Sequence, residues 1–382
     1  MLNNLRIRNF RMLEDLEIPK LGRVNLIIGK NNSGKSTVLE ALRLYAGKAM
    51  PALLNEILDN HDESTNRDNT SSQNWYGLAN LFTGREFPSN DNTFISFESD
   101  GKSLLKIENI FYYINEQLET QIAQNGIELN IPRSHIITVD QSTALLRKDE
   151  FDLIPAIRFT LESGSKSVLD LNDASKRMGL PISWQMQSTF KPSYSYVPTN
   201  IKETEILAEL WDDITQSSNE PIMLEFLKII DENIIGLSFV KGSTPNKRVA
   251  KIKLKNIESP ISMKSMGDGI SRLLQIVLSI FPAKNGILLI DEFENGLHFS
   301  VQEQVWSLIF KLAKELNIQV FATTHSWDCI ESFTKVAVEN PEEGVLLKVS
   351  KSARTSHNGK SIVTIYDEEA LQTITATDLE VR

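Results

Sequence analysis

The chain has 382 residues, of which 41% are hydrophobic and 24% are charged. These values are ordinary for a globular protein and exclude a disordered or collagen-like chain. The formal net charge is −10, from 50 acidic and 40 basic residues. This balance argues against a surface that is positive throughout for nucleic acid, although it leaves room for a local basic groove.

The cysteine content and the apolar segments indicate a cytoplasmic protein without a membrane partner. The single cysteine, Cys329, excludes an intrachain disulfide and a zinc site built from cysteines, which fits a reducing, intracellular setting. The longest uncharged apolar run, from Leu273 to Phe281, is far shorter than the ~20 residues that span a bilayer. The N-terminal residues MLNNLRIRNF lack the apolar core of a signal peptide.

The hydrophobic pattern predicts an α/β fold. In chain order we expect strands at 5–10 and 24–28, a helix after residue 34 and a hairpin over 94–114 that turns at Asp100-Gly101. A helical pair over 202–231, a strand at 249–254 and a helix at 269–281 follow. The last elements are a strand at 287–290, a helix at 301–316, a strand at 318–322 and a terminal strand pair at 344–349 and 362–366. Continuous apolar runs such as VNLII and ILLI are typical of buried parallel strands. We expect one bilobed domain over 1–382, with an N-terminal lobe at 1–140, a partly helical middle insertion at 141–260 and a C-terminal lobe at 261–382.

The strongest motif follows the strand VNLII. Residues Gly29-Lys30-Asn31-Asn32-Ser33-Gly34-Lys35-Ser36 fit the pattern G-x-x-x-x-G-K-[ST], and they lie between a predicted strand and a predicted helix. Backbone N–H groups of such a loop surround phosphate oxygens, and the helix N-terminus adds partial positive charge. Lys35 would then reach the β- and γ-phosphates, and Ser36 would ligate Mg²⁺. This context favours a phosphate site over a plain glycine-rich turn.

A second motif supports the first. The strand ILLI ends in Asp291-Glu292. Beside a phosphate loop, Asp291 can hold Mg²⁺ through a water, and Glu292 can act as a general base on the attacking water. Alone, the pair would more often mark a helix N-terminus, but together with the phosphate loop it indicates a nucleotide hydrolase.

The spacing of the motifs selects the kind of nucleotide-binding domain. Lys35 and Asp291 are 256 residues apart (291 − 35), which favours a split head with a large insertion over a simple GTPase-like domain. The segment from Ser265 to Arg272 opens an apolar helix, and its start is a second anion-binding N-terminus. His325 follows the strand IQVFA, where it can contact a γ-phosphate and sense its presence.

These motifs carry a family resemblance. GKNNSGKS, SMGDGIS, ILLIDEFENGLH and ATTHS, in this order, resemble the ATP-binding-cassette (ABC) ATPases of the SMC and RecF type. They resemble more closely the AAA-labelled ATP-binding proteins related to the overcoming-lysogenisation-defect (OLD) nucleases. The opening residues LRIRNFRMLEDLEI are also similar to that group. The resemblance covers about residues 1–50 and 260–335, and it implies an ABC/SMC-type head with a mixed sheet flanked by helices and a helical insertion.

The resemblance also implies roles for individual residues. Lys35, Glu292 and the switch histidine His325 would be catalytic, and Ser36 and Asp291 would hold the metal. In the family, the signature segment caps ATP bound to a partner subunit, and Glu294, Asn295 and Leu297-His298 lie at its D-loop. With ATP and Mg²⁺ as cofactors, the cofactor-binding prediction comprises Gly29, Asn31, Asn32, Ser33, Gly34, Lys35, Ser36 and Thr37 of the phosphate loop, and Ser265, Gly267 and Gly269 of the signature segment.

The chain departs from the family pattern in three places. The signature segment reads SMGDG instead of the transporter form LSGGQ, although SMGDG suits the OLD-like group. Phe293 stands where relatives usually have proline, which affects the rigidity of the loop. The family's glutamine loop has two candidate positions, Gln141 and the segment Val197-Pro198-Thr199. His298 has a second interpretation, because such a residue more often caps a helix or packs at an interface than takes part in catalysis.

A cluster of lysines leaves two interpretations open. Lys251, Lys253 and Lys255 lie on one face of a predicted strand, beside Lys247 and Arg248. They could contact a DNA backbone, or they could form the solvated face of an edge strand, where lysine discourages aggregation. The acidic net charge favours the edge-strand interpretation.

The sequence predicts an ATP-driven switch. Two copies would sandwich two ATP molecules in a homodimer and regulate a partner in anti-phage defence or DNA maintenance. The 57 residues after His325 (382 − 325) are too few for the Toprim nuclease domain of OLD nucleases, so we expect the partner to be a separately encoded nuclease or toxin. The alternative is a RecF-like DNA-binding repair ATPase. A transporter subunit is disfavoured by the absence of LSGGQ and by the long insertion, and a scaffold is disfavoured because every catalytic residue is present.

Overall fold

The computed structural model describes residues 1–63, 76–122, 128–172, 193–217, 219–242, 247–341, 343–352, 360–366, 370–371 and 373, with the backbone alone over 116–122 and 128–135. The chain forms two compact units. The first comprises Met1–Leu5, Leu16–Gly47 and Pro192–Arg382, and the second comprises Arg6–Asp15 and Lys48–Lys191. Because both units are assembled from separate stretches, the segment boundaries expected from the sequence stay a prediction. Within the described ranges, no helix has the length and apolar character needed to cross a membrane.

A six-stranded sheet forms the centre of the first unit, with the strand order β16-β15-β3-β14-β13-β9. Neighbouring strands from β15 to β9 pair parallel, and β16 pairs antiparallel with β15. VNLII, ILLI and QVFAT are each buried along their whole length, as expected for parallel strands covered on both faces. The strands are β3 (Val24–Ile28), β9 (Tyr194–Val197), β13 (Ile287–Ile290), β14 (Gln319–Thr323), β15 (Gly344–Lys351) and β16 (Ser361–Tyr366).

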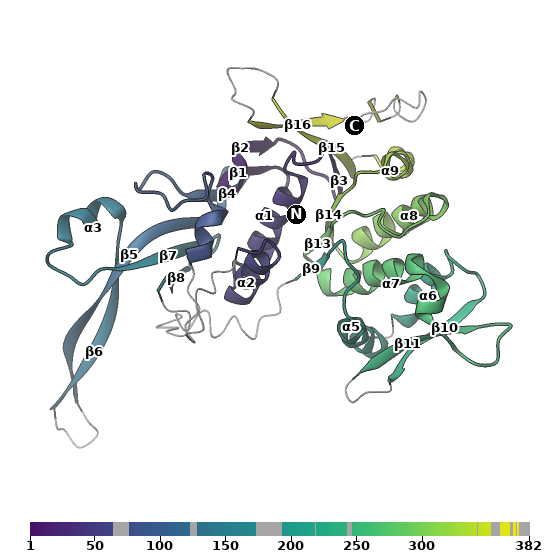
Figure 1. Cartoon of the computed structure of the whole chain (residues 1–382), viewed down its shortest axis with the longest axis horizontal. Coiled ribbons are helices and arrows are strands. Elements are labelled where there is room, and N and C mark those ends of the chain that lie inside the picture. The colour runs from purple at the N-terminus through teal and green to yellow at the C-terminus, as the bar shows by residue number, and fades with distance from the viewer. Residues whose placement is uncertain are drawn as a thin grey trace. The chain divides into compact units, whose positions relative to one another are not determined.

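Helices lie on both sides of this sheet. Figure 1 draws α1 (Lys35–Ala46) on one side and α8 (Phe299–Glu315) and α9 (Trp327–Glu339) on the other. The predicted α/β class and the flanking helices are therefore confirmed. Helix α9 was not predicted, although the sequence contains its start signal: the hydroxyl of Ser326 accepts a hydrogen bond from the N–H of Cys329, an N-cap arrangement.

Helices and a small sheet pack around α7 (Asp268–Ile280) in the same unit. The predicted helical pair is present as α5 (Thr204–Gln216) and α6 (Glu220–Leu227). The following strands form a three-stranded sheet of order β10-β11-β12. Its strands are β10 (Ile234–Lys241), β11 (Arg248–Leu254) and β12 (Ile261–Ser262), and two short 3-10 helices, η2 (Met263–Met266) and η3 (Phe281–Ala283), precede and follow α7. The middle insertion thus contains strands as well as the expected helices.

The second unit is built on a seven-stranded sheet of order β2-β1-β4-β5-β7-β8, in which β6 also pairs with β5. The predicted hairpin is confirmed: β4 and β5 turn at Asp100 and Gly101, whose φ angles are 49° and 72°. Beyond β7, β5 and β6 continue as a long two-stranded arm (Figure 1). The elements are β1 (Leu5–Phe10), β2 (Leu13–Ile18), α2 (Pro51–Asp59), η1 (Tyr76–Leu81), β4 (Ile95–Ser99), β5 (Lys102–Ile122), β6 (Glu128–Val139), α3 (Gln141–Arg147), β7 (Ile154–Leu161) and β8 (Lys166–Asp170).

A buried asparagine fixes the start of β3 and therefore the loop at its end. The side chain of Asn25 is fully buried. Its oxygen accepts a hydrogen bond from the N–H of Gly22 at 2.8 Å, and its amide donates to the carbonyls of Gly22 and Val320 at 2.9 and 3.1 Å. Because buried backbone groups are costly to leave unpaired, this side chain holds β3 against β14.

We predict that Asn25→Ala lowers the free energy of unfolding by about 2–4 kcal/mol, because it removes three buried hydrogen bonds to backbone groups of Gly22 and Val320. Urea unfolding followed by tryptophan fluorescence measures this change. The matched control is Asn256→Ala, at an exposed asparagine of the same unit, which should shift the free energy by less than about 0.5 kcal/mol. Equal effects of the two substitutions would contradict the prediction.

Candidate nucleotide site

The motif residues gather at one edge of the six-stranded sheet. The phosphate loop follows β3, Asp291 follows β13, His325 follows β14 and Thr199 follows β9. These four strands are parallel neighbours, so their carboxyl ends meet at the same edge, which is where ligands bind in open α/β sheets.

The phosphate loop needs its glycines for conformation and for space. Gly29 and Gly34 have φ angles of 146° and 110°, values that side chains rarely allow. A Cβ at Gly29 would overlap the carbonyl of Val349 and lie 2.8 Å from the hydroxyl of Ser33. That hydroxyl is buried and has no hydrogen-bond partner. An orphaned donor inside a loop of backbone N–H groups is a feature that a phosphate oxygen would satisfy.

Lys35 is the first residue of α1 and carries a buried ammonium group. Its Nζ donates to the carbonyls of Gly29 and Lys30 at 2.8 and 3.1 Å. Burial holds the pKa of Lys35 below its ordinary value, and the negative charges of Asp291, Glu292 and Glu294 oppose that shift. The structure therefore brings the predicted lysine and the predicted carboxylates into one electrostatic site. Ser36, Asn31 and Asn32 are exposed on the same loop, and Thr37 is half-buried.

Two threonines hold the carboxylate of Asp291. The hydroxyl of Thr323 donates to Oδ1 at 2.7 Å and also accepts the N–H of Glu292 at 2.9 Å. The hydroxyl of Thr199 donates to Oδ2 at 3.4 Å. The sequence placed Thr199 only in a candidate segment for the glutamine loop and assigned Thr323 no role of its own, although a threonine at the end of a buried strand was a visible signal. Among the described residues no three carboxylate, histidine or cysteine side chains form a metal cluster.

Glu292 differs from Asp291 in backbone and surroundings. Its φ is 46°, a strained value for a side chain of this size, and no described residue donates a hydrogen bond to its carboxylate. The next acid, Glu294, accepts the backbone N–H of His325 at 2.7 Å through Oε1, and its Oε2 is buried without a partner. The ring of His325 is exposed. Glu294 thus connects the segment after β13 to the loop after β14.

A buried arginine links helix α7 to the ends of β9 and β13. The guanidinium of Arg272 donates to the carbonyls of Asp291 and Glu292 at 2.7 and 2.8 Å, and to that of Pro198. Arg272 is 1% exposed, and burial lowers its pKa to about 10. The guanidinium therefore stays charged at neutral pH, where five fixed donors suit several carbonyl acceptors. The sequence did not single out this residue for a role.

The predicted signature residues lie at the start of α7. Ser265 and Gly267 are exposed, and a Cβ at Gly267, whose φ is 90°, would meet no atom within 4 Å. Gly269 lies against the segment after β13, because a Cβ there would be 3.0 Å from the carbonyl oxygen of Gly296. The signature segment is therefore open at Ser265 and Gly267 and packed at Gly269.

The departures from the family pattern have structural explanations. Phe293 is fully buried and stacks on Trp306, with ring centroids 3.9 Å apart, so an aromatic contact restrains this loop. His298 is the N-cap of α8 and accepts from the N–H of Ser300, which matches the capping interpretation. Of the two candidates for the glutamine loop, the segment that ends in Thr199 lies beside Asp291, whereas Gln141 belongs to the second unit.

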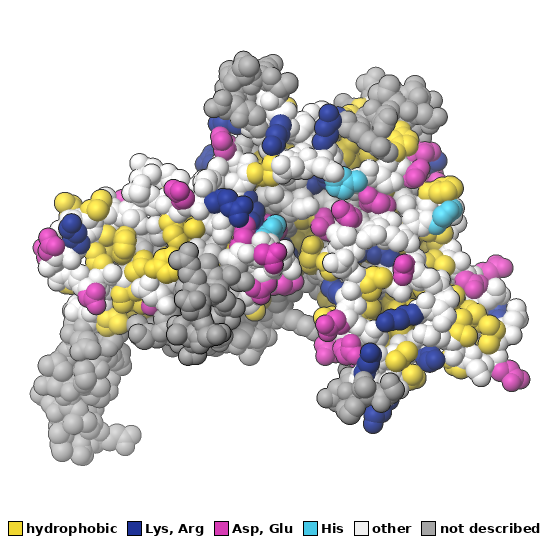
Figure 2. All heavy atoms as spheres, viewed as in Figure 1, with side chains coloured by type: hydrophobic (Ala, Val, Ile, Leu, Met, Phe, Trp, Pro, Cys, Tyr) yellow, Lys and Arg dark blue, Asp and Glu magenta, His cyan; other side chains and the backbone are white. Residues whose placement is uncertain are grey.

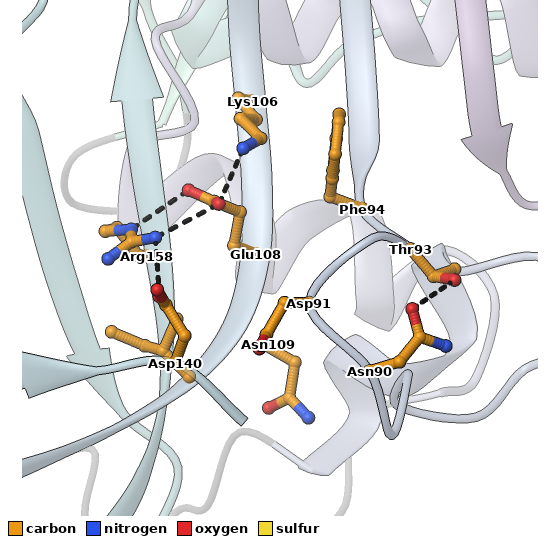
Figure 3. Close-up of a pocket in the computed structure, with 10 residues that line it drawn as sticks. Asn90, Asp91, Thr93, Phe94, Lys106, Glu108, Asn109, Asp140 and Arg158 are labelled. Atoms are coloured by element: carbon orange, nitrogen blue, oxygen red, sulfur yellow. Dashed lines mark hydrogen bonds and ion pairs between the residues drawn. The ribbon is translucent and has the colours of Figure 1, made fainter. Parts of the chain in front are cut away.

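A polar cavity of about 250 Å³ lies in the second unit (Figure 3). Arg158 on β7 and Lys106 on β5 both bind the carboxylate of Glu108, and Arg158 also reaches Asp140 at 3.1 Å. Burial alone would raise the pKa of Glu108, but the hydrogen bonds from Arg158 and Lys106 outweigh burial and hold that pKa below its ordinary value. These charges compensate one another and join β5 to β7.

The family comparison agrees with this site. Residues 1–330 match the family model described as an AAA ATPase domain. The chain belongs to this family. It is an ATPase related to the OLD proteins, and both the predicted activity and that predicted relationship are confirmed.

Three similar proteins illustrate the relationship. An ATP/GTP phosphatase of Helicobacter pylori is 27% identical over 353 residues, which cover 89% of each chain. An OLD nuclease of Thermus scotoductus is 25% identical over 350 residues, which cover 85% of this chain but 59% of the nuclease. An SMC head bound to the C-terminal winged-helix domain of ScpA superposes with a TM-score of 0.46 at 14% identity, covering 96% of this chain and 98% of that structure.

We predict that Thr323→Val lowers kcat for ATP about 10- to 100-fold, because the isosteric side chain removes the bonds to both Asp291 and Glu292. The Mg²⁺ concentration for half-maximal turnover should rise as well, since Asp291 loses its orientation. Steady-state turnover over a magnesium titration measures both effects. Thr323→Ser keeps the hydroxyl and should stay within about threefold of the wild type. A wild-type magnesium profile for Thr323→Val would show that the hydroxyl has no positioning role.

Proposed function

We propose that the protein is an ATP-driven switch in which two copies enclose two ATP molecules. One observation carries this proposal. The charged groups of the site, from Lys35 to Glu292, converge within one unit, while the signature segment stays open at Ser265 and Gly267. The exposed backbone at the start of a second copy's α7 could then supply further donors to a phosphate bound at Lys35.

Each residue has a definite task in this proposal. The N–H groups of the phosphate loop and Lys35 bind and orient the phosphates, which is most of what phosphoryl-transfer catalysis requires. Ser36 and Asp291 would hold Mg²⁺, which when bound neutralises charge on the phosphate oxygens. Glu292 accepts a proton from the attacking water, because its carboxylate is not engaged by other described donors. His325, exposed at the end of β14, contacts the γ-phosphate.

Arg272 couples the two halves of this arrangement. It lies one turn into the helix that the signature segment opens, and its guanidinium bonds the carbonyls of Asp291 and Glu292. A second copy that moves α7 would therefore move the backbone of the catalytic acids. Such a link suits a switch whose hydrolysis depends on dimer closure.

We infer a cytoplasmic protein that regulates a separate effector, a nuclease or toxin, in anti-phage defence or DNA maintenance. The support is the related OLD nuclease, of which this chain spans 59%. A RecF-like repair ATPase remains the alternative, and stimulation of turnover by DNA would favour it.

We predict that Glu292→Gln binds ATP but hydrolyses it at least about 100-fold more slowly, so that the ATP-bound dimer accumulates. Size-exclusion chromatography with light scattering, with and without ATP and Mg²⁺, measures the mass. The matched control is Glu303→Gln, at an exposed carboxylate of α8, which should turn over ATP like the wild type. Unchanged hydrolysis by Glu292→Gln would remove the general-base assignment, and a monomeric mass with ATP would contradict the dimer.

We predict that Lys35→Ala weakens ATP binding by about 100-fold or more, because the buried ammonium contacts the phosphate loop directly. Titration with a fluorescent ATP analogue measures the dissociation constant. Removal of Mg²⁺ with EDTA should abolish turnover by the wild type and leave residual nucleotide binding. If Lys35→Ala binds ATP with wild-type affinity, the loop is not the phosphate site.

A further inference from the structure

A cationic segment stands out in this acidic protein. Between Ile234 and Ile257 the sequence contains no Asp or Glu, although the whole chain carries 50 acidic residues. The charged residues of the segment are Lys241, Lys247, Arg248, Lys251, Lys253 and Lys255. The described part of this segment forms β10 and β11 of the three-stranded sheet.

The strand pattern puts two of these lysines on the outer face of the sheet. Ala250 and Ile252 are buried against the helices, and because side chains alternate along a strand, Lys251 and Lys253 point the other way. Lys253 is exposed and Lys251 is half-buried. Figure 2 shows Lys and Arg side chains on the part of the surface where Figure 1 draws β10 and β11.

Protection of a sheet edge does not account for Lys251. β11 is the central strand of the sheet, with β10 on one side and β12 on the other. Lys251 lies opposite Ser238 of β10 and opposite Ser262 of β12. The edge-strand interpretation favoured by the sequence is therefore wrong at Lys251, because both neighbouring strands are already paired there.

The lysine charges are not compensated within the described part of the chain. No described carboxylate forms an ion pair with Lys251, Lys253 or Lys255. Arg248 on the same strand shows the contrast, because it makes a two-pronged ion pair with Asp212 of α5. These three lysines are thus available to bind an external anion.

The composition of the face favours a phosphodiester backbone over a protein partner. Opposite the two lysines lie small residues, Gly236 and Ser238, and Ser238 adds a hydroxyl donor. The next pair on this face, Val240 and Val249, is apolar. Lysine is depleted in protein–protein interfaces, where arginine and aromatic residues dominate. Single-stranded nucleic acid is usually held by stacking on aromatic side chains, and the outer face of β10–β11 presents none. Lysine and hydroxyl contacts to phosphates are the ordinary means of binding duplex DNA.

We propose that the outer face of the β10–β11–β12 sheet binds the backbone of double-stranded DNA. Alternate lysines along β11 repeat at about 6.8 Å, so Lys251 and Lys253 can contact separate phosphates of one strand. The binding is expected to be independent of sequence, because contacts to phosphates carry no sequence information.

This face is continuous with the signature segment. Ser262, which lies opposite Lys251, is followed directly by η2 and then by Gly267 and α7. A DNA backbone on Lys251 would therefore lie beside β12, whose last residue, Ser262, is three residues before Ser265. This regulatory consequence rests on the proposed dimer switch, whereas DNA binding itself does not.

The test is equilibrium binding of a fluorescein-labelled 30-base-pair duplex to the full chain without ATP, followed by anisotropy at several salt concentrations. We expect Lys251→Gln/Lys253→Gln to weaken binding about tenfold at 0.1 M salt and to reduce the slope of log K against log salt by about 1.8, that is, about 0.9 for each lost phosphate contact. The matched control, Lys311→Gln/Lys314→Gln, neutralises two exposed lysines of α8 and should bind like the wild type.

Three results would overturn the proposal: no duplex binding by the wild type, equal binding by both double variants, or displacement of the duplex by polyglutamate at equal charge concentration. An unchanged melting temperature for Lys251→Gln/Lys253→Gln excludes unfolding as the cause of weaker binding. Because the assay contains no ATP, it is independent of dimer closure. If Glu292→Gln dimerises with ATP while the duplex fails to bind, the proposed switch is supported and the proposed DNA-binding face is refuted. If the duplex binds as expected while Glu292→Gln stays monomeric, the proposed DNA-binding face is supported and the proposed ATP-dependent dimer is refuted.

Discussion

The geometry of the site depends on the hydrogen bonds that the guanidinium of Arg272 donates to backbone carbonyls. This guanidinium is buried, it is charged at neutral pH, and it bonds the backbone carbonyls at the ends of two parallel strands. Burying an unpaired cation costs several kcal/mol, and charge-assisted bonds to carbonyls offset about 1.5–3 kcal/mol each. The negative charges of Asp291, Glu294 and Glu292 also favour its charged form. The positive charge of Arg272 and the negative charges of the three acids therefore stabilise one another.

The charge balance of the site explains why a divalent cation is expected. Two buried cations, Lys35 and Arg272, face three carboxylates, those of Asp291, Glu292 and Glu294. The formal sum is −1 (2 − 3), and nucleotide phosphates add more negative charge to the same space. Repulsion among these groups in a partly buried site is strong, so Mg²⁺ on Ser36 and Asp291 would be needed to bring phosphates against the acids.

The strain at Glu292 has a related physical reason. A left-handed backbone at a glutamate costs of order 1–3 kcal/mol, yet it is held by the bond from its N–H to Thr323 and by the bond from Arg272 to its carbonyl. Asp291 and Glu292 are adjacent, but one carboxylate is bound by two hydroxyls and the other is free of such bonds among the described residues. In the proposed mechanism, the backbone turn between them would separate a metal-holding role from a proton-accepting role.

The sequence by itself determined the buried strands and the loop chemistry. VNLII, ILLI and IQVFA are mostly apolar, which predicts strands covered on both faces, and the glycines of the phosphate loop require backbone conformations that other residues disfavour. These are local properties. Only the tertiary structure decided which strands are neighbours, and therefore that Thr199, Thr323 and Arg272 meet Asp291 across separations of 92, 32 and 19 residues. It also decided that β11 is a central strand, because pairing between distant segments depends on the packing of the whole unit and not on the pattern within one strand.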